Sequence, residues 1–367
     1  MPDNETRFDR SYVLAAATLI VVAALLPAPA LAADGASIPR TANGRPDLSG
    51  TYDVATLTPF QRSAALGEKK ELSDEEAAAV ARSAAARADF ASRPSDPERG
   101  APRAGSNVGG YNLFYIDAGE GAIRIDGRFR TSILVDPPNG RLPEMTAEGA
   151  ERTGARLAGW RRDLQESGEG AWWVALGIGP YDDPENRPFG ERCLLGFGST
   201  AGPPAKPVLY NNLKRIVQTE DHIVILNEMN HDARIIPIGG EHGPTGVRRW
   251  LGDSVARWEG DTLVIDTVHF RPGEASLSTP DFDINFVTSE KLHVVERFTR
   301  VDIETLLYQF TVNDPGTWTR PWSGEYPWPA SDTRLHEYAC HEGNYALGNI
   351  MRGARLAERE AEAGDGH

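Results

Sequence analysis

A chain of 367 residues is long enough for one large domain with a sizeable hydrophobic core, and its composition is that of a globular protein. Its formal net charge at pH 7 is −15. This charge repels nucleic acid and anionic lipid, so we exclude both as partners. The partner we expect is a small-molecule ligand or substrate, on the grounds of the fold and candidate residues given below. No oligomeric state is predicted.

The beginning of the chain has the three parts of a secretion signal. Arg7 and Arg10 form a basic start, residues 12–26 form an apolar run, and Ala30 and Ala32 are small residues two positions apart. The run is shorter than the roughly 20 residues that span a bilayer. We predict that residues up to Ala32 are removed and that the mature protein is periplasmic or secreted. An uncleaved N-terminal anchor is the alternative, and no later segment is predicted to span a membrane.

Residues 33–110 are predicted to form an extended and helical N-terminal extension. The first part is rich in glycine and proline and has little periodicity. A helix is expected from residue 72 to about 91. Ser73 can cap its first turn, and Glu76, three residues later, completes a capping box.

Residues 111–345 are predicted to form a β-rich core domain that includes a helix near 146–164. Successive hairpins indicate an antiparallel meander, and closing into a barrel is the usual way to remove its exposed edges. We therefore predict a mainly β, barrel-like fold, lipocalin- or calycin-like in general shape. An open sheet covered by helices is the alternative. A C-terminal helix and tail are expected over 346–367. The clearest hairpins pair 213–217 with 222–229, 255–258 with 263–268, and 292–298 with 305–312.

Cys193 and Cys340 are the two cysteines of the chain. An exported protein meets an oxidising environment, which permits a disulfide. Neither cysteine has a CxxC partner or the spacing of a metal ligand. We predict a bridge between them, with two buried thiols as the alternative.

Short runs along nearly the whole predicted mature chain carry a family resemblance. They are PRT at 39–41 with PDLSG at 46–50, NEMNHDAR at 227–234, WEGDTLV at 258–264, VERF at 295–298 and YACHEGN at 338–344. Together they resemble a large family of exported bacterial β-rich proteins, over roughly residues 39–355. The resemblance implies export and a domain of this extent. It implies no particular reaction, cofactor or catalytic residue.

The first group of candidate catalytic residues lies at the end of the strand that begins near residue 222. Glu228, His231, Asp232 and Arg234 supply an acid, a titratable base, a carboxylate and a fixed cation within seven residues. A carboxylate can orient a histidine and raise its pKa, which suits general base catalysis near neutral pH. Solvated charges at a strand end, with an internal ion pair, are the alternative.

The second group lies on the strand 292–298. Strict alternation places Glu296 on the same face as apolar neighbours, so its carboxyl could have a raised pKa and act as a general acid unless a cation pairs with it. His293 and Arg297 face the other way, and we include them as candidate catalytic and substrate-binding residues. A buried structural ion pair at Glu296 is the alternative.

The third group lies near the C-terminus. A bridge at Cys340 would hold His341 in a fixed position, as catalytic groups require, although the same loop would also serve as a plain clamp. Trp318 and Trp322, close to an arginine in the sequence, could stack on a planar or sugar-like ligand. Packing of the two tryptophans as core is the alternative.

These residues support two classes of function. The first is an acid–base enzyme (a lyase, isomerase or hydrolase) that handles a small molecule in the barrel without a cofactor. The alternative is a non-catalytic periplasmic carrier for an apolar small molecule. A divalent metal held by His231, His293 and His341 with nearby carboxylates is a lesser possibility, because no HExxH motif or compact ligand spacing is present. The candidate catalytic residues are Glu228, His231, Asp232, His293, Glu296 and His341, and the candidate substrate-binding residues are Arg234, Arg297, Trp318 and Trp322.

Overall fold

The computed structural model describes residues 37–94, 98, 100, 116–155, 179, 181–196, 202–274 and 286–364. The predicted signal peptide lies outside the described residues. The fold below belongs to residues 33–367, which form one unit.

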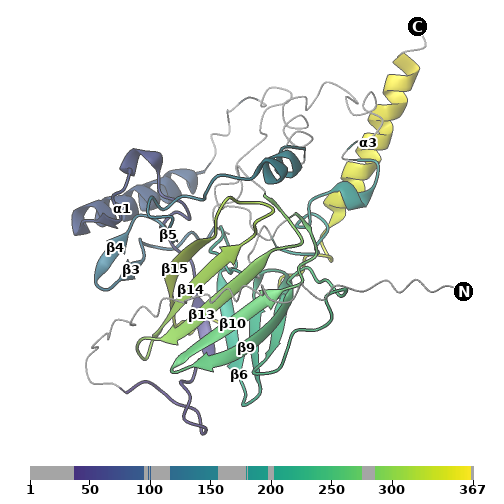
Figure 1. The fold of residues 1–367 in the computed structure, drawn as a ribbon. Helices are drawn as coiled ribbons and strands as arrows, with labels where there is room; N and C mark the ends of the chain where they lie inside the picture. The colour runs from purple at the N-terminus through teal and green to yellow at the C-terminus, as the bar shows by residue number, and fades with distance from the viewer. Residues whose placement is uncertain are drawn as a thin grey trace, which may run out of the picture. The chain divides into compact units, whose positions relative to one another are not determined.

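Two antiparallel sheets contain most of the described strands (Figure 1). The smaller sheet has four strands, in the spatial order β1 (Gly50–Asp53), β6 (Leu213–Gln218), β7 (His222–Asn227) and β8 (Ala233–Pro237). The larger sheet has six, in the order β5 (Leu134–Asp136), β15 (Trp322–Pro329), β14 (Thr305–Asn313), β13 (His293–Arg300), β10 (Thr262–Val268) and β9 (Asp253–Glu259). The three predicted hairpins are confirmed as β6–β7, β9–β10 and β13–β14.

The described strands do not close into a barrel. Their ladders form separate sheets, which meet at two corners through single bridges: Tyr52 with Ala330, and Ile238 with Ala256. At the second corner the chain leaves β8 at Pro237, which has no N–H to donate to a further ladder. The mainly β, antiparallel prediction is therefore confirmed, whereas the predicted continuous closure is not seen among the described strands.

The remaining described elements are short strands, single helical turns and helices. A three-stranded sheet has the order β2 (Glu71–Leu72), β4 (Arg128–Arg130) and β3 (Arg124–Ile125). A two-stranded sheet pairs β11 (Gly273–Glu274) with β12 (Val287–Thr288). The single turns are η1 (Ala64–Leu66), η4 (Pro184–Asn186) and η5 (Met229–His231).

The helices agree with the sequence-based expectations where they are described. Helix α1 (Asp74–Ala91) begins with the predicted capping box between Ser73 and Glu76. Helix α3 (Tyr345–Gly364) is the predicted C-terminal helix. Residues 147–155 are helical, and the rest of the helix predicted near 146–164 lies outside the described residues. Among the described helices, none has the length and apolar character that a membrane crossing requires.

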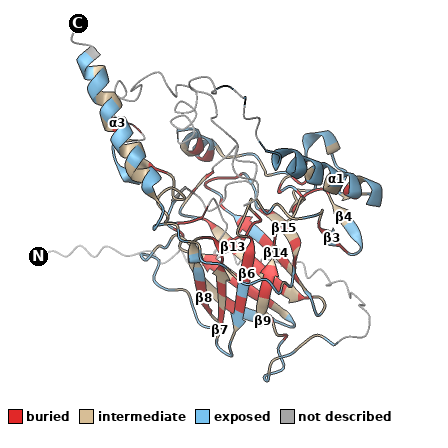
Figure 2. Ribbon diagram, turned by 180° about the vertical axis from the view of Figure 1, so that it is seen from behind, coloured by how far each residue is buried: buried red, intermediate tan, exposed pale blue. Residues whose placement is uncertain are grey.

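One hydrophobic core takes side chains from both large sheets. Buried and partly exposed residues alternate along β13 and β14, so one face of the larger sheet points into this core (Figure 2). Tyr52 of the smaller sheet packs against Trp328 of the larger one, with ring centroids 6.3 Å apart. Trp328 also contacts Phe298, at 5.2 Å. Aromatic burial of this kind holds the two sheets together from the inside.

The predicted disulfide between Cys193 and Cys340 is present, and it joins segments 147 positions apart. Hydrogen bonds on both sides of the bridge strengthen this attachment. Asn344 donates to the carbonyl of Glu191 at 2.7 Å, and Arg355 of α3 donates to the carbonyl of Tyr181 at 2.7 Å. The C-terminal segment is therefore fastened to the segment 181–196.

Removing the disulfide should destabilise the protein. The bridge restricts a long loop in the unfolded chain, and its chain-entropy contribution is at most about 5 kcal/mol. We expect a Cys193→Ser/Cys340→Ser variant to unfold at a lower denaturant concentration than the oxidised wild type. Reduced wild-type protein should match the variant. Equal midpoints for the oxidised wild type and the variant would contradict a stabilising role for the bridge.

Candidate functional site

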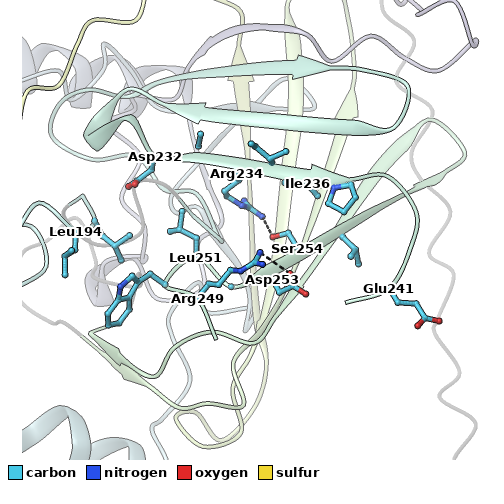
Figure 3. Close-up of a pocket in the computed structure, with 16 residues that line it drawn as sticks. Leu194, Asp232, Arg234, Ile236, Glu241, Arg249, Leu251, Asp253 and Ser254 are labelled. Atoms are coloured by element: carbon cyan, nitrogen blue, oxygen red, sulfur yellow. Dashed lines mark hydrogen bonds and ion pairs between the residues drawn. The ribbon is translucent and has the colours of Figure 1, made fainter. Parts of the chain in front are cut away.

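A cavity of about 470 Å³ lies beside β8 (Figure 3). Its walls are β8, the segment 249–255 and the pair Leu194–Leu195 next to the disulfide. This volume is in the usual range for small-molecule sites. The charged and polar residues among the 16 that line it are Asp232, Arg234, Glu241, Arg249, Asp253 and Ser254.

A local turn brings two of these residues to the cavity. The alternation predicted for the strand starting at residue 222 holds only to Asn227, where β7 ends. Asn230 and His231 then adopt left-handed φ values of 59° and 53°. The chain reverses there, so Asp232 and Arg234 follow at the start of β8 and line the cavity.

Gly252 sets the position of the opposite wall. Its φ is +71°, and an added Cβ would lie 2.6 Å from a methyl carbon of Thr267 and 2.9 Å from the ring of Phe270. Only glycine combines this backbone conformation with so close an approach. The close packing fixes the chain immediately before Asp253, which lines the cavity.

Arg234 and Glu296 form a buried ion pair that joins the two sheets. The guanidinium of Arg234 donates to both carboxylate oxygens of Glu296, at 3.0 and 2.6 Å. Tyr308 donates to the same carboxylate at 2.8 Å, and Ser254 accepts from Arg234 at 3.1 Å. The predicted inward direction of Glu296 is confirmed, and its cation comes from the neighbouring sheet. A carboxylate held in this way is a structural anion.

Asp232 has the most perturbed carboxyl group at the cavity. Burial raises its pKa to about 6, against the opposing effects of Lys214 and a backbone hydrogen bond from Gly196. Its Oδ2 atom is buried and makes no hydrogen bond. Burial also lowers the pKa of Lys214 to about 7, although Asp232 and Glu228 favour its charged form. The two groups therefore change charge within about one pH unit of each other, near neutrality.

Glu228 and His231 hold the C-terminal segment. The backbone N–H of His336 donates to Oε1 of Glu228 at 2.9 Å, and that of Tyr338 donates to Nε2 of His231 at 2.7 Å. His341 follows in the same segment, and its side chain is exposed. The three predicted catalytic residues are thus near or on the attachment of the tail, and none of them lines the described cavity.

The predicted substrate-binding residues Arg297, Trp318 and Trp322 lie away from the cavity and make contacts within the fold. Arg297 pairs with Glu259 at 2.9 Å on the outer face of the larger sheet. Trp318 and Trp322 are buried in the core, where their rings pack 5.4 Å apart. The core packing of these tryptophans is the alternative that the sequence left open.

Asp253 connects the cavity to a group of histidines that the sequence reasoning largely missed. Its carboxylate lies 3.4 Å from Arg249, and it accepts a backbone hydrogen bond from Gly243 at 2.7 Å. Nδ1 of His242 lies 3.4 Å from Oδ2 of Asp253, and Nδ1 of His269 lies 3.9 Å from the same oxygen.

His293, a predicted catalytic residue, belongs to this group through Asp266. Nε2 of His293 and Nε2 of His242 each lie 3.0 Å from an oxygen of Asp266. The hydrogen bond with His293 lowers the pKa of Asp266, and the same bond raises the pKa of His293. No group of three or more His, Cys, Asp or Glu side chains within the described ranges is placed to hold a metal ion.

Comparison with protein-family models, curated proteins and solved structures finds no match. The family resemblance therefore stays a prediction from the sequence.

The Arg234–Glu296 pair should show strong coupling in a double-mutant cycle. Arg234→Leu or Glu296→Leu alone leaves one charge buried without its partner, which costs about 3–5 kcal/mol of unfolding free energy. The double variant should lose less than the sum of the two single losses. Denaturant unfolding measures all four proteins. Arg297→Leu, which breaks an exposed pair, is the matched control and should cost no more than about 1 kcal/mol. Additive losses would argue against the pair as a link between the sheets.

Asp232 should make stability depend on pH between about 4 and 6. Its folded-state pKa lies above its unfolded value of about 3.9, so the folded protein binds more protons in this window. The unfolding free energy of the wild type should fall as pH rises through it, by on the order of 1–3 kcal/mol more than that of Asp232→Asn. Denaturant unfolding at several pH values tests this, and parallel pH curves for the two proteins would contradict it.

Proposed function

We propose that the protein is an exported acid–base enzyme that acts on a small molecule in the cavity, with Asp232 as a proton-transfer group. The reaction classes are those expected from the sequence, namely lyase, isomerase or hydrolase. The observation that carries this proposal is the carboxyl of Asp232, which lines the cavity and has a buried oxygen without a hydrogen bond.

The pKa of Asp232 supports the role. Efficient general acids and bases have pKa values close to the working pH, and burial brings that of Asp232 to about 6. The group is present in both protonation states near neutral pH. Lys214, with a pKa of about 7, exerts a charge effect on it and can balance its loss or gain of a proton.

The lining of the cavity favours this role over the carrier alternative. A carrier for an apolar molecule needs a mainly apolar cavity with one or two polar anchors. Here Asp232, Arg234, Glu241, Arg249 and Asp253 are all charged residues of the wall. Leu194, Ile235, Trp250 and Leu251 add apolar surface, so a ligand with one charged and one apolar part suits the cavity best.

The location and the wider shape belong to the same proposal. The sequence signal at residues 1–32 and the disulfide support export to the periplasm or beyond. The two corner bridges between the large sheets support a barrel-like container in which the cavity lies next to the β8–β9 corner. The family resemblance agrees with export and adds nothing on the reaction.

An NMR assay in D2O can test the three reaction classes together. The mature wild-type protein is incubated with a panel of small carbonyl compounds, hydroxy acids and esters, and spectra report C–H exchange, isomerisation, elimination and hydrolysis. We expect at least one compound to react, and we expect Asp232→Asn to lower the rate about 10²–10⁴-fold because it cannot transfer the proton.

Asp221→Asn is the matched control for this experiment. Asp221 is an exposed carboxylate paired with His222 on the surface, so its replacement should leave the rate unchanged. An active Asp232→Asn protein would remove Asp232 from the proposal. A wild type that converts no compound but retains an apolar molecule in native mass spectrometry would favour the carrier.

A further inference from the structure

Three histidines and two aspartates form a continuous chain of contacts behind one wall of the cavity. In order, the chain runs from His269 to Asp253, His242, Asp266 and His293, with contact distances of 3.9, 3.4, 3.0 and 3.0 Å. The residues come from β9, β10, β13 and the connections beside them.

Asp253 and His293, two members of this chain, have different surroundings. Asp253 lines the cavity, where Figure 3 shows it beside Arg249 and apart from Asp232. The side chain of His293 is 38% exposed to solvent. Hydrogen bonds join His242, Asp266 and His293, and Nδ1 of His242 lies 3.4 Å from Asp253 without a hydrogen bond, so the chain of contacts runs from the cavity to bulk water.

We propose that Asp253 and His242 form a second proton-transfer site of the cavity, in which Asp253 takes a proton from the substrate and His242 relays it through Asp266 and His293 to solvent. This inference rests on the proposed function and adds the base that works together with Asp232 as acid. Two proton-transfer groups from different walls suit a proton shift within one molecule, or an elimination, better than hydrolysis.

The contacts of Asp253 identify it as the base. Arg249 lies 3.4 Å from one oxygen of its carboxylate and the N–H of Gly243 donates to the other, so the carboxylate has a fixed orientation beside His242. Nδ1 of His242 is buried and makes no hydrogen bond, while Nε2 of the same ring is held by Asp266. A ring protonated on Nε2 has an open lone pair at Nδ1, 3.4 Å from Asp253, and catalytic contacts of this length shorten when substrate binds.

The protons balance over one turnover. Asp253 accepts a proton from a C–H bond of the substrate and passes it to Nδ1 of His242, whose positive charge is stabilised by Asp266. Asp232 donates its proton to another atom of the substrate or to the leaving group. His242 then releases its Nε2 proton to solvent through Asp266 and His293, and the proton left on Nδ1 moves to Nε2 by exchange with solvent before the next turnover. Asp232 regains a proton, so no oxidant or reductant is needed.

Arg249 indicates the class of substrate. Its side chain is 65% exposed, it lines the cavity, and its contact with Asp253 involves only one of its terminal nitrogens. The remaining donors can bind a carboxylate. A small carboxylic acid with a C–H next to a carbonyl or hydroxyl carbon fits these groups.

The groups that surround His242 determine which substitutions can test its role in proton transfer. Asp253, Asp266 and His269 face its ring directly, and His293 and Arg249 act on it through the two carboxylates. His242→Gln keeps polarity but cannot carry a proton. Asp266→Asn keeps the imidazole and removes the group that orients it.

The test uses the reacting compounds of the NMR panel with full-length mature protein. We expect His242→Gln to lower kcat about 10–100-fold with little change in KM, and Asp266→Asn to lower it at least about 10-fold. Added imidazole should restore activity to His242→Ala, an effect that a purely structural role would not give. His222→Gln, which alters an exposed histidine, is the matched control and should match the wild type.

Each outcome decides between the two proposals. Wild-type kcat in both His242→Gln and Asp266→Asn, with an inactive Asp232→Asn, would overturn the relay and leave the proposed function standing. The relay would also be overturned if Asp266→Asn is fully active while His242→Ala is inactive and either is not rescued by imidazole or does not fold. His242 would then have a structural role. A wild type inactive on every compound would overturn both.

Discussion

The structure depends on one buried charge pair more than on any other polar contact. Arg234 belongs to the smaller sheet and Glu296 to the larger, and neither charge can remain in the core without the other. Tyr308 completes the bonding of the carboxylate. Because the pair has a demanding geometry, it fixes how β8 faces β13. It also places Arg234 at the base of the cavity, so the same contact that joins the sheets determines where a ligand can bind.

A second constraint comes from the C-terminal segment. The disulfide at Cys193 holds this segment beside Leu194 and Leu195, which form a wall of the cavity. Glu228 and His231 accept backbone hydrogen bonds from it. The side chains of Glu228 and His231 therefore hold the C-terminal segment and do not line the cavity, whereas Asp232, the residue after His231, does line it.

Local rules account for what the sequence could predict. Alternation placed Glu296 inward, the spacing of Ser73 and Glu76 marked a helix start, and hairpin turns located most of the strands. Lys214 was open to the same reasoning, because it lies two positions before buried Ile216 on β6 and therefore shares its face. His242 and Asp253 were not, since their contact depends on a glycine-rich connection and on the packing of three strands. A contact between distant segments leaves no periodic pattern in the sequence, so pattern-based reasoning could not predict it.

Desolvation links the stability of this protein to its chemistry. Burying Lys214 and Asp232 disfavours their charged forms, which weakens the folded state near neutral pH and moves both pKa values toward it. The histidines near Asp253 have a different environment, because hydrogen bonds to Asp266 fix the rings of His242 and His293 and the bond with His293 raises the pKa of that ring. One wall of the cavity thus holds Asp232, whose pKa is raised by burial, and another holds Asp253 in contact with Arg249 and His242. Two carboxyl groups that line one cavity from different segments are the geometric condition for moving a proton across a bound molecule in the proposed reaction.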